Sequence, residues 1–250
     1  MISLMKYYLV MNQNVRHVMF SADLKEGTKK SHSAAENTKF VGAFLRGVVD
    51  EEEYKKLITN FFYVYATMEE LIQATNDPIA SVLKQYQAKL NRTAFLEQDL
   101  RYFYGPMWRE AVYRGESEAC KTYIHRLNEV AENDPYLLIA HHYTRYIGDL
   151  SGGQILRNIA EKALKPPKGA GLMFYEFPRV PDPKAFKTEY RAVLDELPLD
   201  ESQKNAMIAE ANYAFRLNMY LFDEIQSRDK YPLLTSLKGL WKVATGFIGG

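Results

Sequence analysis

Helical spacing of apolar residues along almost the whole chain is the feature that most restricts its fold. After Asp50, which can cap a helix, a broad apolar face follows, made of Tyr54, Leu57, Ile58, Phe61, Phe62, Tyr65 and Met68. The alternating apolar and polar runs typical of strands, bounded by turn residues, are absent from the sequence. The chain is therefore predicted to be all-α.

Start and stop signals place the individual helices. Ser21 is the predicted N-cap of the first helix, and Asp50 that of the second. Gly105-Pro106 should end the third, because proline lacks a backbone donor and disfavours helix in the residue before it. From the third onward, the helices are expected at about 91–104, 116–133, 134–164, 183–196 and 200–227, with 165–171 as the clearest loop.

No linker rich in Gly, Pro or Ser divides the 250 residues, so one domain is expected. Its predicted span is 21–227, between an N-terminal tail at 1–20 and an amphipathic C-terminal tail at 228–250. The apolar pattern of the second tail is shorter than the roughly 20 residues of a membrane span. No transmembrane anchor is therefore expected, and contact of this tail with a membrane surface, docking on the domain and fraying stay open.

Charge and cysteine content exclude several classes of function. With 32 basic and 31 acidic residues the net charge is +1, so no overall field favours nucleic acid. The single cysteine, Cys120, excludes a disulfide framework and a cysteine-based metal cluster, and it indicates a reducing compartment. Cys120 itself is expected to be an ordinary helix residue.

Residues 143–154, Tyr-Thr-Arg-Tyr-Ile-Gly-Asp-Leu-Ser-Gly-Gly-Gln, place three glycines inside a predicted helix. Each interior glycine costs about 0.5–1 kcal/mol relative to alanine, so the run indicates a bend or the close approach of something flat. Gly148 and Gly152 lie one turn apart and would present bare backbone, while Ser151 and Gly153 can ease a kink. Close packing of two helices is the alternative, and Arg145 with Asp149 can equally be a surface ion pair.

A second unusual pattern lies in the first helix. Lys25, Lys29, His32 and Glu36 share one narrow helical stripe, where a core-facing helix would be apolar. Imidazole is a good ligand for haem iron, the lysines can meet the two propionates, and the carboxylate can hold the imidazole ring. A solvated basic face with an incidental histidine is the alternative, and this stripe alone does not exclude it.

These segments together resemble the biliverdin-forming haem oxygenase family, in its soluble, cyanobacterial or plastid-like type. Besides 143–154, the resemblance rests on 24–32 (Leu-Lys-Glu-Gly-Thr-Lys-Lys-Ser-His), 35–37, 96–100, 104–106, 186–191 and 211–218. The motifs keep the family's order over roughly 20–225. The resemblance implies one multi-helix domain that holds haem between a proximal helix and a kinked distal helix.

The resemblance also implies roles for single residues. His32 would be the proximal iron ligand, and Gly148 and Gly152 would lie over the ring on the distal side. Asp149 would organise the water chain that delivers protons, helped by Arg145 and Tyr65. The remaining residues implied to contact haem or to close its pocket are Lys25, Lys29, Glu36, Tyr143, Thr144, Ser151, Lys187, Arg191, Phe215 and Asn218.

The function that this implies is oxidative cleavage of haem b, both cofactor and substrate, with O2 at the α-meso carbon. The products would be biliverdin IXα, Fe2+ and CO, with electrons from ferredoxin, a possible bilin reductase downstream, and a location in the bacterial cytosol or plastid stroma. Haem storage without turnover is the alternative. A thiamin-degrading hydrolase would need Cys120 as its nucleophile, and a di-iron bundle would need Glu-x-x-His pairs that the sequence lacks.

Overall fold

The computed structural model describes residues 19–227, and every regular element within that range is helical. The prediction of an all-α fold is therefore confirmed for this part of the chain. The predicted C-terminal tail and residues 1–18 of the predicted N-terminal tail lie outside the described residues. Among the helices inside that range, none combines the length and the apolarity needed to cross a membrane.

The elements follow one another along the chain with short connections. They are α2 (Phe20–Glu36), α3 (Lys39–Leu45), α4 (Glu51–Ala74), η1 (Ala80–Tyr86), α5 (Gln87–Leu90), α6 (Thr93–Tyr104), α7 (Trp108–Val112), α8 (Glu118–Asn133), η2 (Pro135–Leu137), α9 (Leu138–His142), η3 (Tyr143–Ile147), η4 (Asp149–Gly153), α10 (Gln154–Leu164), η5 (Met173–Tyr175), α11 (Pro183–Asp195) and α12 (Glu201–Ser227).

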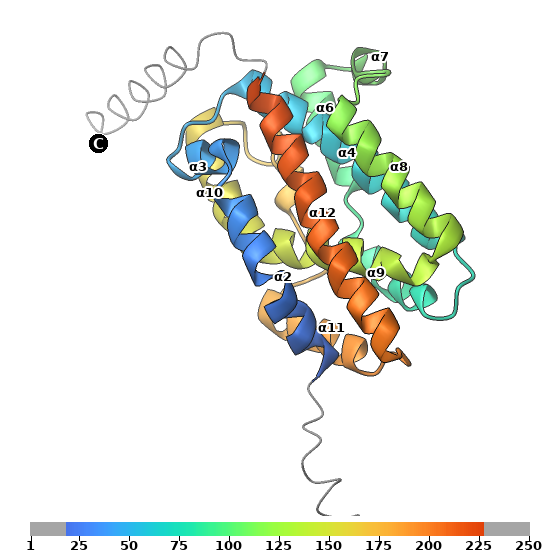
Figure 1. Ribbon diagram of the computed structural model, residues 1–250. Coiled ribbons are helices and arrows are strands. Elements are labelled where there is room, and N and C mark those ends of the chain that lie inside the picture. Colours follow the sequence, from blue (N-terminus) through green and yellow to red (C-terminus); the bar gives the residue numbers. More distant parts are fainter. Residues whose placement is uncertain (1–18, 228–250) are drawn as a thin grey trace, which may run out of the picture.

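The long helix α12 packs against several other helices of the bundle, namely α2, α3, α4, α8 and α9 (Figure 1). Its inward face carries fully buried residues at helical spacing, namely Met207, Ala211, Ala214, Leu217 and Leu221. The helix α2 runs beside it on one side, and α8 and α9 lie on the other (Figure 1). The helix α12 thus contacts both the first predicted functional helix, α2, and the start of the glycine-rich segment, η3.

Helix boundaries follow the predicted signals at several ends and depart from them at the first. The Asp50 carboxylate accepts hydrogen bonds from the amides of Glu52 and Glu53, which confirms it as the N-cap of α4. Ser21, however, is not a cap, because α2 already begins at Phe20. Its amide and hydroxyl instead donate to the Asp195 carboxylate of α11, at 2.7 and 3.0 Å.

The predicted helix at 134–164 is interrupted. Two π-helical segments, η3 and η4, lie on either side of Gly148 and separate α9 from α10. A π-helical turn carries one extra residue per turn, and such turns occur frequently at functional sites. The expected kink therefore takes the form of a locally widened helix, which no helix signal in the sequence predicts.

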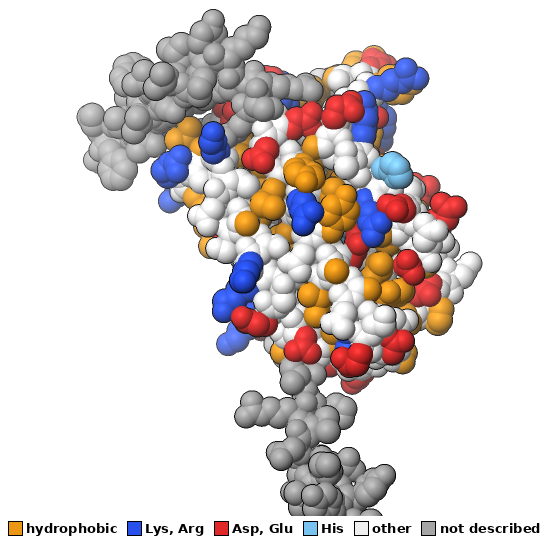
Figure 2. All heavy atoms as spheres, viewed as in Figure 1, with side chains coloured by type: hydrophobic (Ala, Val, Ile, Leu, Met, Phe, Trp, Pro, Cys, Tyr) orange, Lys and Arg blue, Asp and Glu red, His pale blue; other side chains and the backbone are white. Residues whose placement is uncertain are grey.

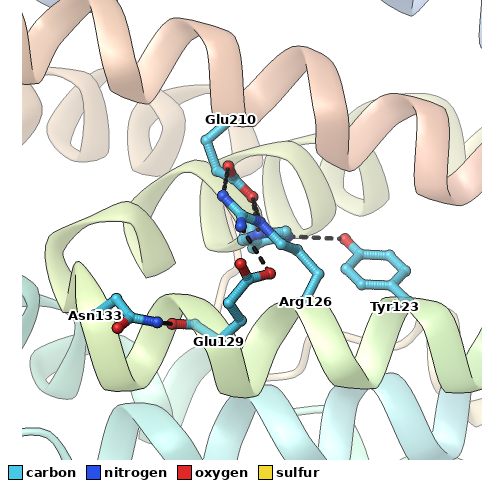
Figure 3. A network of polar contacts seen from close by, with 6 residues as sticks. Tyr123, Arg126, Glu129, Asn133 and Glu210 are labelled. Atoms are coloured by element: carbon cyan, nitrogen blue, oxygen red, sulfur yellow. Dashed lines mark hydrogen bonds and ion pairs between the residues drawn. The ribbon is translucent and has the colours of Figure 1, made fainter.

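A buried charged network ties α8 and α9 to α12 (Figure 3). The Glu210 carboxylate receives hydrogen bonds from the Arg126 guanidinium, at 2.9 and 2.6 Å, and lies 2.8 Å from Nε2 of His141. The other ring nitrogen of His141 lies 3.4 Å from the Tyr123 hydroxyl. Because His141 is the last residue but one of α9, directly before η3, this network anchors the start of the widened segment.

Candidate active site

Four side chains from four elements, α4, η3, η4 and α12, form a buried polar cluster at the glycine-rich segment. The Tyr65 hydroxyl of α4 donates to the Asp149 carboxylate in η4 and accepts a hydrogen bond from Nε of Arg145 at 3.0 Å. The guanidinium of Arg145 also donates to the side-chain oxygen of Asn218 on α12. The structure thus brings together four of the residues that the resemblance assigned to the distal side or the pocket wall.

Burial controls the ionisation of this cluster. Burial raises the pKa of Asp149, while the charge of Arg145 and the Tyr65 hydrogen bond pull it down. Burial also raises the pKa of Tyr65 well above its ordinary value, so the phenol keeps its proton near neutral pH. The result is a carboxyl group with a raised pKa that accepts a hydrogen bond from a protonated phenol and lies near a permanent positive charge, which suits a group that holds and passes protons.

The backbone next to this cluster is bare. A Cβ atom added to Gly148 or Gly152 would meet no heavy atom within 4 Å, whereas one added to Gly153 would lie 3.7 Å from the Tyr175 ring. Gly153 therefore serves packing inside the protein. The other two glycines face open space, which rules out the alternative that they allow close packing of another described helix.

On the proximal side, His32 presents an accessible imidazole. Its side chain is 56% exposed, and its Nδ1 lies 3.6 Å from Oε2 of Glu36 one turn later. The ring meets the Phe215 ring of α12 edge to face, with centroids 5.6 Å apart. An exposed imidazole with a carboxylate on one nitrogen leaves its other nitrogen able to bind a metal.

The helix α12 connects the proximal and distal sides. Phe215 contacts His32, and Asn218, less than one turn further along the same helix, binds Arg145 beside Asp149. A second connection runs through α11, where Lys187 donates to the hydroxyl of Ser151 in η4 at 2.9 Å. The imidazole and the bare glycines are thus held around a common region by two helices.

Cations and polar groups line one edge of this region. Arg191 donates to the carbonyl of Lys187 at 3.5 Å. Two buried atoms, Nε of Arg191 and Oγ1 of Thr144, have no hydrogen-bond partner among the described residues. Burial raises the pKa of Tyr143, and the nearby charge of Arg191 counteracts this effect. Buried donors without a protein partner are the groups that a bound anion would satisfy.

Two predicted lysines are not drawn into these contacts. Lys25 and Lys29 are exposed on α2, and the ammonium of Lys29 pairs with Glu26 of the same helix at 3.3 Å. Such an exposed pair stabilises a helix little, so both side chains are available to a ligand at the edge of the region.

Several residues of this site carried no clear signal in the sequence. Gln154 donates to the carbonyls of Asp149 and Tyr175, at 3.4 and 2.9 Å, and so ties η4 to η5. The ring of Phe174 in η5 packs against that of Tyr65 with centroids 5.5 Å apart. Only the position of Gln154 at the end of the glycine-rich motif could have drawn attention to it.

Two other features are separate from this region. Cys120 is fully buried, and burial raises the pKa of its thiol to about 12. The prediction that it is an ordinary helix residue is therefore confirmed. A thiamin-degrading hydrolase would need Cys120 as a reactive thiolate, so this alternative loses its nucleophile. A cavity of about 360 Å³ lies near the ends of α4 and α12, lined by residues that include Lys56, Tyr104 and Glu116. None of the predicted site residues lines it.

The fold and the site define a helical protein that can hold a flat, anionic ligand between an imidazole and bare backbone. Comparison with known proteins identifies the family. The heme oxygenase family model matches residues 18–224, and the chain belongs to that family.

Individual relatives agree with this assignment. Heme oxygenase 1 of Nostoc sp. is 50% identical over 204 residues, which cover 81% of this chain and 84% of the relative. The crystal structure of heme oxygenase-1 from Synechocystis sp. in complex with heme has a TM-score of 0.81 and 44% identity, covering 91% of this chain and 99% of that one. That of Synechocystis sp. heme oxygenase-2 with heme and NO has a TM-score of 0.80 and 42% identity, covering 84% and 86%.

Proposed function

We propose that this protein is a haem oxygenase that cleaves haem b at the α-meso carbon with O2 to give biliverdin IXα, Fe2+ and CO. The observation that carries the proposal is the Asp149 carboxylate, which accepts a hydrogen bond from the Tyr65 hydroxyl, itself bonded by Arg145, directly beside the bare backbone of Gly148. Bound haem would supply both the iron that activates dioxygen and the macrocycle that is oxidised.

The residues present fit haem as the ligand. The exposed ring of His32 is suited to an axial iron ligand, and Glu36 can fix its tautomer through Nδ1. The open space at Gly148 and Gly152 accommodates a planar ring, since no side chain of this helix stands in its way. The unpaired Nε of Arg191, with Lys187 close by, can meet the propionate carboxylates.

The distal cluster favours turnover over storage. Storage requires a ligand for iron and an apolar wall, but no acid beside the ring. The carboxyl of Asp149 would order water next to the iron and pass protons to the reduced dioxygen, while Arg145 and Tyr65 keep that carboxyl in place. Buried titratable groups whose pKa is shifted by burial and by a specific charge partner cluster at functional sites, which supports this role for Asp149.

The anchoring of the propionates would determine which meso carbon is oxidised. Rotation of the macrocycle in its own plane would present a different edge to the oxygen, and the fixed cations oppose this rotation. Lys187 is held by the Ser151 hydroxyl and Arg191 by the backbone of its own helix. These two residues would hold the edge of a bound ring next to η4, because Lys187 bonds to that segment.

We also propose ferredoxin as the electron donor, with a cytosolic or stromal location. Basic side chains group along the edge of the molecule where α2 lies (Figure 2), and Lys25, Lys29 and Lys30 are exposed there, on the helix that carries His32. An acidic redox protein would be steered to this edge by charge, and the association would weaken as salt rises. A bilin reductase would then use the released biliverdin.

Turnover tests the proposal directly. Haemin is added to the purified protein with a ferredoxin–ferredoxin reductase couple, and the Soret band is followed together with the long-wavelength absorbance of a bilin. Loss of the first band with growth of the second is expected. A stable Soret band under reducing, aerobic conditions would instead indicate storage.

The axial ligand is tested separately with His32→Ala. This variant should lose the iron–imidazole absorption spectrum and recover it when free imidazole is added. If its haem spectrum matches that of the wild type without imidazole, another residue must bind the iron.

A further inference from the structure

The helix that carries His32 is bonded to α12 at the residue immediately before His32. The Ser31 hydroxyl donates to the side-chain oxygen of Asn212 on α12 at 2.5 Å. The amide nitrogen of Asn212 donates in turn to the backbone carbonyl of Gly27 at 3.1 Å and to that of Ile208 in its own helix at 2.9 Å. A single side chain thus bonds both a side chain and the backbone of α2.

The two helices are also as close as they can be at this point. A Cβ atom added to Gly27 would lie 2.6 Å from Cγ2 of Ile208, well inside contact distance. A glycine is therefore required here for the close approach, and α2 cannot slide or rotate against α12 without a clash or the loss of the Asn212 bonds.

A second tether holds the start of α2. The Asp195 carboxylate of α11 accepts hydrogen bonds from the amide and the hydroxyl of Ser21. From Ser21 to Ser31 the helix rises about 15 Å, so the tethers hold it at two well separated points. The His32 ring, by contrast, is 56% exposed, so the backbone of α2 determines its position more than packing around it does.

We propose that Asn212 is a positioning residue for His32, because it fixes the height and the rotation of α2 relative to α12 and thereby the distance of the imidazole from the distal glycines. The inference rests on the proposed function, in which His32 is the iron ligand. Asn212 itself touches neither the ligand region described above nor the ring of His32; it acts through Ser31 and Gly27.

The test compares Asn212→Ala with Asn128→Ala. Asn128 on α8 also donates to the carbonyl four residues earlier in its own helix, at 2.8 Å, but bonds to no other helix within residues 19–227. The full chain of each variant is loaded with haemin, and two quantities are measured: the haem Kd, and the iron–imidazole stretching band of the ferrous form by resonance Raman spectroscopy.

Asn212→Ala should bind haem about fivefold to tenfold more weakly, a change equal to the net contribution of about one hydrogen bond, and its stretching band should shift or broaden. Asn128→Ala should match the wild type in both. Asn212→Asp, which keeps the acceptor for Ser31 but loses the donor to Gly27, should lie between.

The possible outcomes separate this inference from the proposed function. If Asn212→Ala and Asn128→Ala both give the Kd and the band of the wild type, Asn212 does not position His32. In that case the chain still binds haem through His32, and the proposed function stands. If the wild type itself shows no iron–imidazole band, the assignment of His32 fails, and this inference fails with it. A loss of apoprotein thermal stability alone, with the band unchanged, also contradicts the positioning role.

Discussion

The hydroxyl of Tyr65 and the carboxylate of Asp149 are 84 residues apart in the sequence but share one buried hydrogen bond. The bond joins α4 to the π-helical segment η4, where the helix is widened beside two bare glycines. Arg145 donates to the same phenol from the other side. The position of the carboxyl group is therefore determined by three elements together, which is the preorganisation that proton delivery requires.

Removing the carboxyl group should affect turnover and leave binding intact. Asp149→Ala should retain haem affinity, while the rate of biliverdin formation falls by about 100-fold, the lower end of a general acid–base contribution to a rate. Tyr65→Phe should have a smaller effect in the same direction. Tyr63→Phe is the control, since its hydroxyl donates to the carbonyl of Val112 away from this cluster. Undiminished biliverdin formation by Asp149→Ala would contradict the proton-relay role.

Adding a methyl group at Gly148 should change stability and binding in opposite directions. The site is helical and faces open space, so Gly148→Ala should stabilise the apoprotein by about 0.5–1 kcal/mol. The same methyl group would project into the region proposed for haem and should raise the haem Kd. Urea unfolding of the apoprotein and a haemin titration measure the two effects. Equal haem affinity would place the macrocycle elsewhere.

The pH dependence of turnover should respond to Arg145. Its charge opposes the effect of burial on Asp149, so Arg145→Gln should raise the pKa of that carboxyl group further. If the ionised form of Asp149 orders the water, that form is lost as the pH falls through the pKa of Asp149. Because this pKa is higher in the variant, the acid limb of its pH–rate profile should move to higher pH. An acid limb at the wild-type pH would mean that another group controls it.

Local signals in the sequence predicted those parts of the fold that depend on local chemistry. Asp50 caps α4 because its carboxylate reaches amides two and three residues away, a relation that the sequence alone contains. Ser21 failed as a cap because α2 already begins at Phe20, and the amide and hydroxyl of Ser21 are bound by Asp195, 174 residues away. No pattern near Ser21 reports that partner.

The residues of the site also fall into those that the sequence indicated and those that only the structure reveals. The glycines, Asp149 and His32 stood out because each is unusual in a helix at its own position. The widened segments η3 and η4 and the contacts of Gln154 and Asn212 depend on packing between distant elements. Tyr146, for example, lies in the recognised motif, but its hydrogen bond to Glu69 on α4, at 2.9 Å, could not be inferred from spacing.

The network around Glu210 predicts acid sensitivity of the fold. Burial alone would raise the pKa of Glu210, but hydrogen bonds from His141 and Arg126 lower it from 4.5 to about 2. A carboxylate with a depressed pKa stabilises the folded state above its unfolded pKa, and this contribution disappears as pH falls from 4.5 towards 2. The difference corresponds to at most about 3 kcal/mol.

Urea unfolding of the wild type and of Glu210→Gln at pH 7 and pH 3 measures this contribution. The variant should be less stable at pH 7, and the gap should narrow at pH 3. Glu129→Gln is the control, because Glu129 pairs with the same Arg126 but is 48% exposed, and an exposed pair contributes little. A gap between the wild type and Glu210→Gln that does not change with pH would assign the loss to packing rather than to charge.

The cations of α11 should determine the isomer of the product. Lys187 bonds to Ser151 in η4, and Arg191 lies one turn later with an unpaired buried Nε, so both can hold the propionates against rotation of the ring. The double variant Lys187→Ala with Arg191→Ala should release some biliverdin isomers other than IXα, which chromatography separates. Lys184→Ala, an exposed cation one turn earlier on the same helix, should release the IXα isomer alone. A pure IXα product from the double variant would show that other groups fix the orientation, and the exposed lysines of α2 would be the next to test.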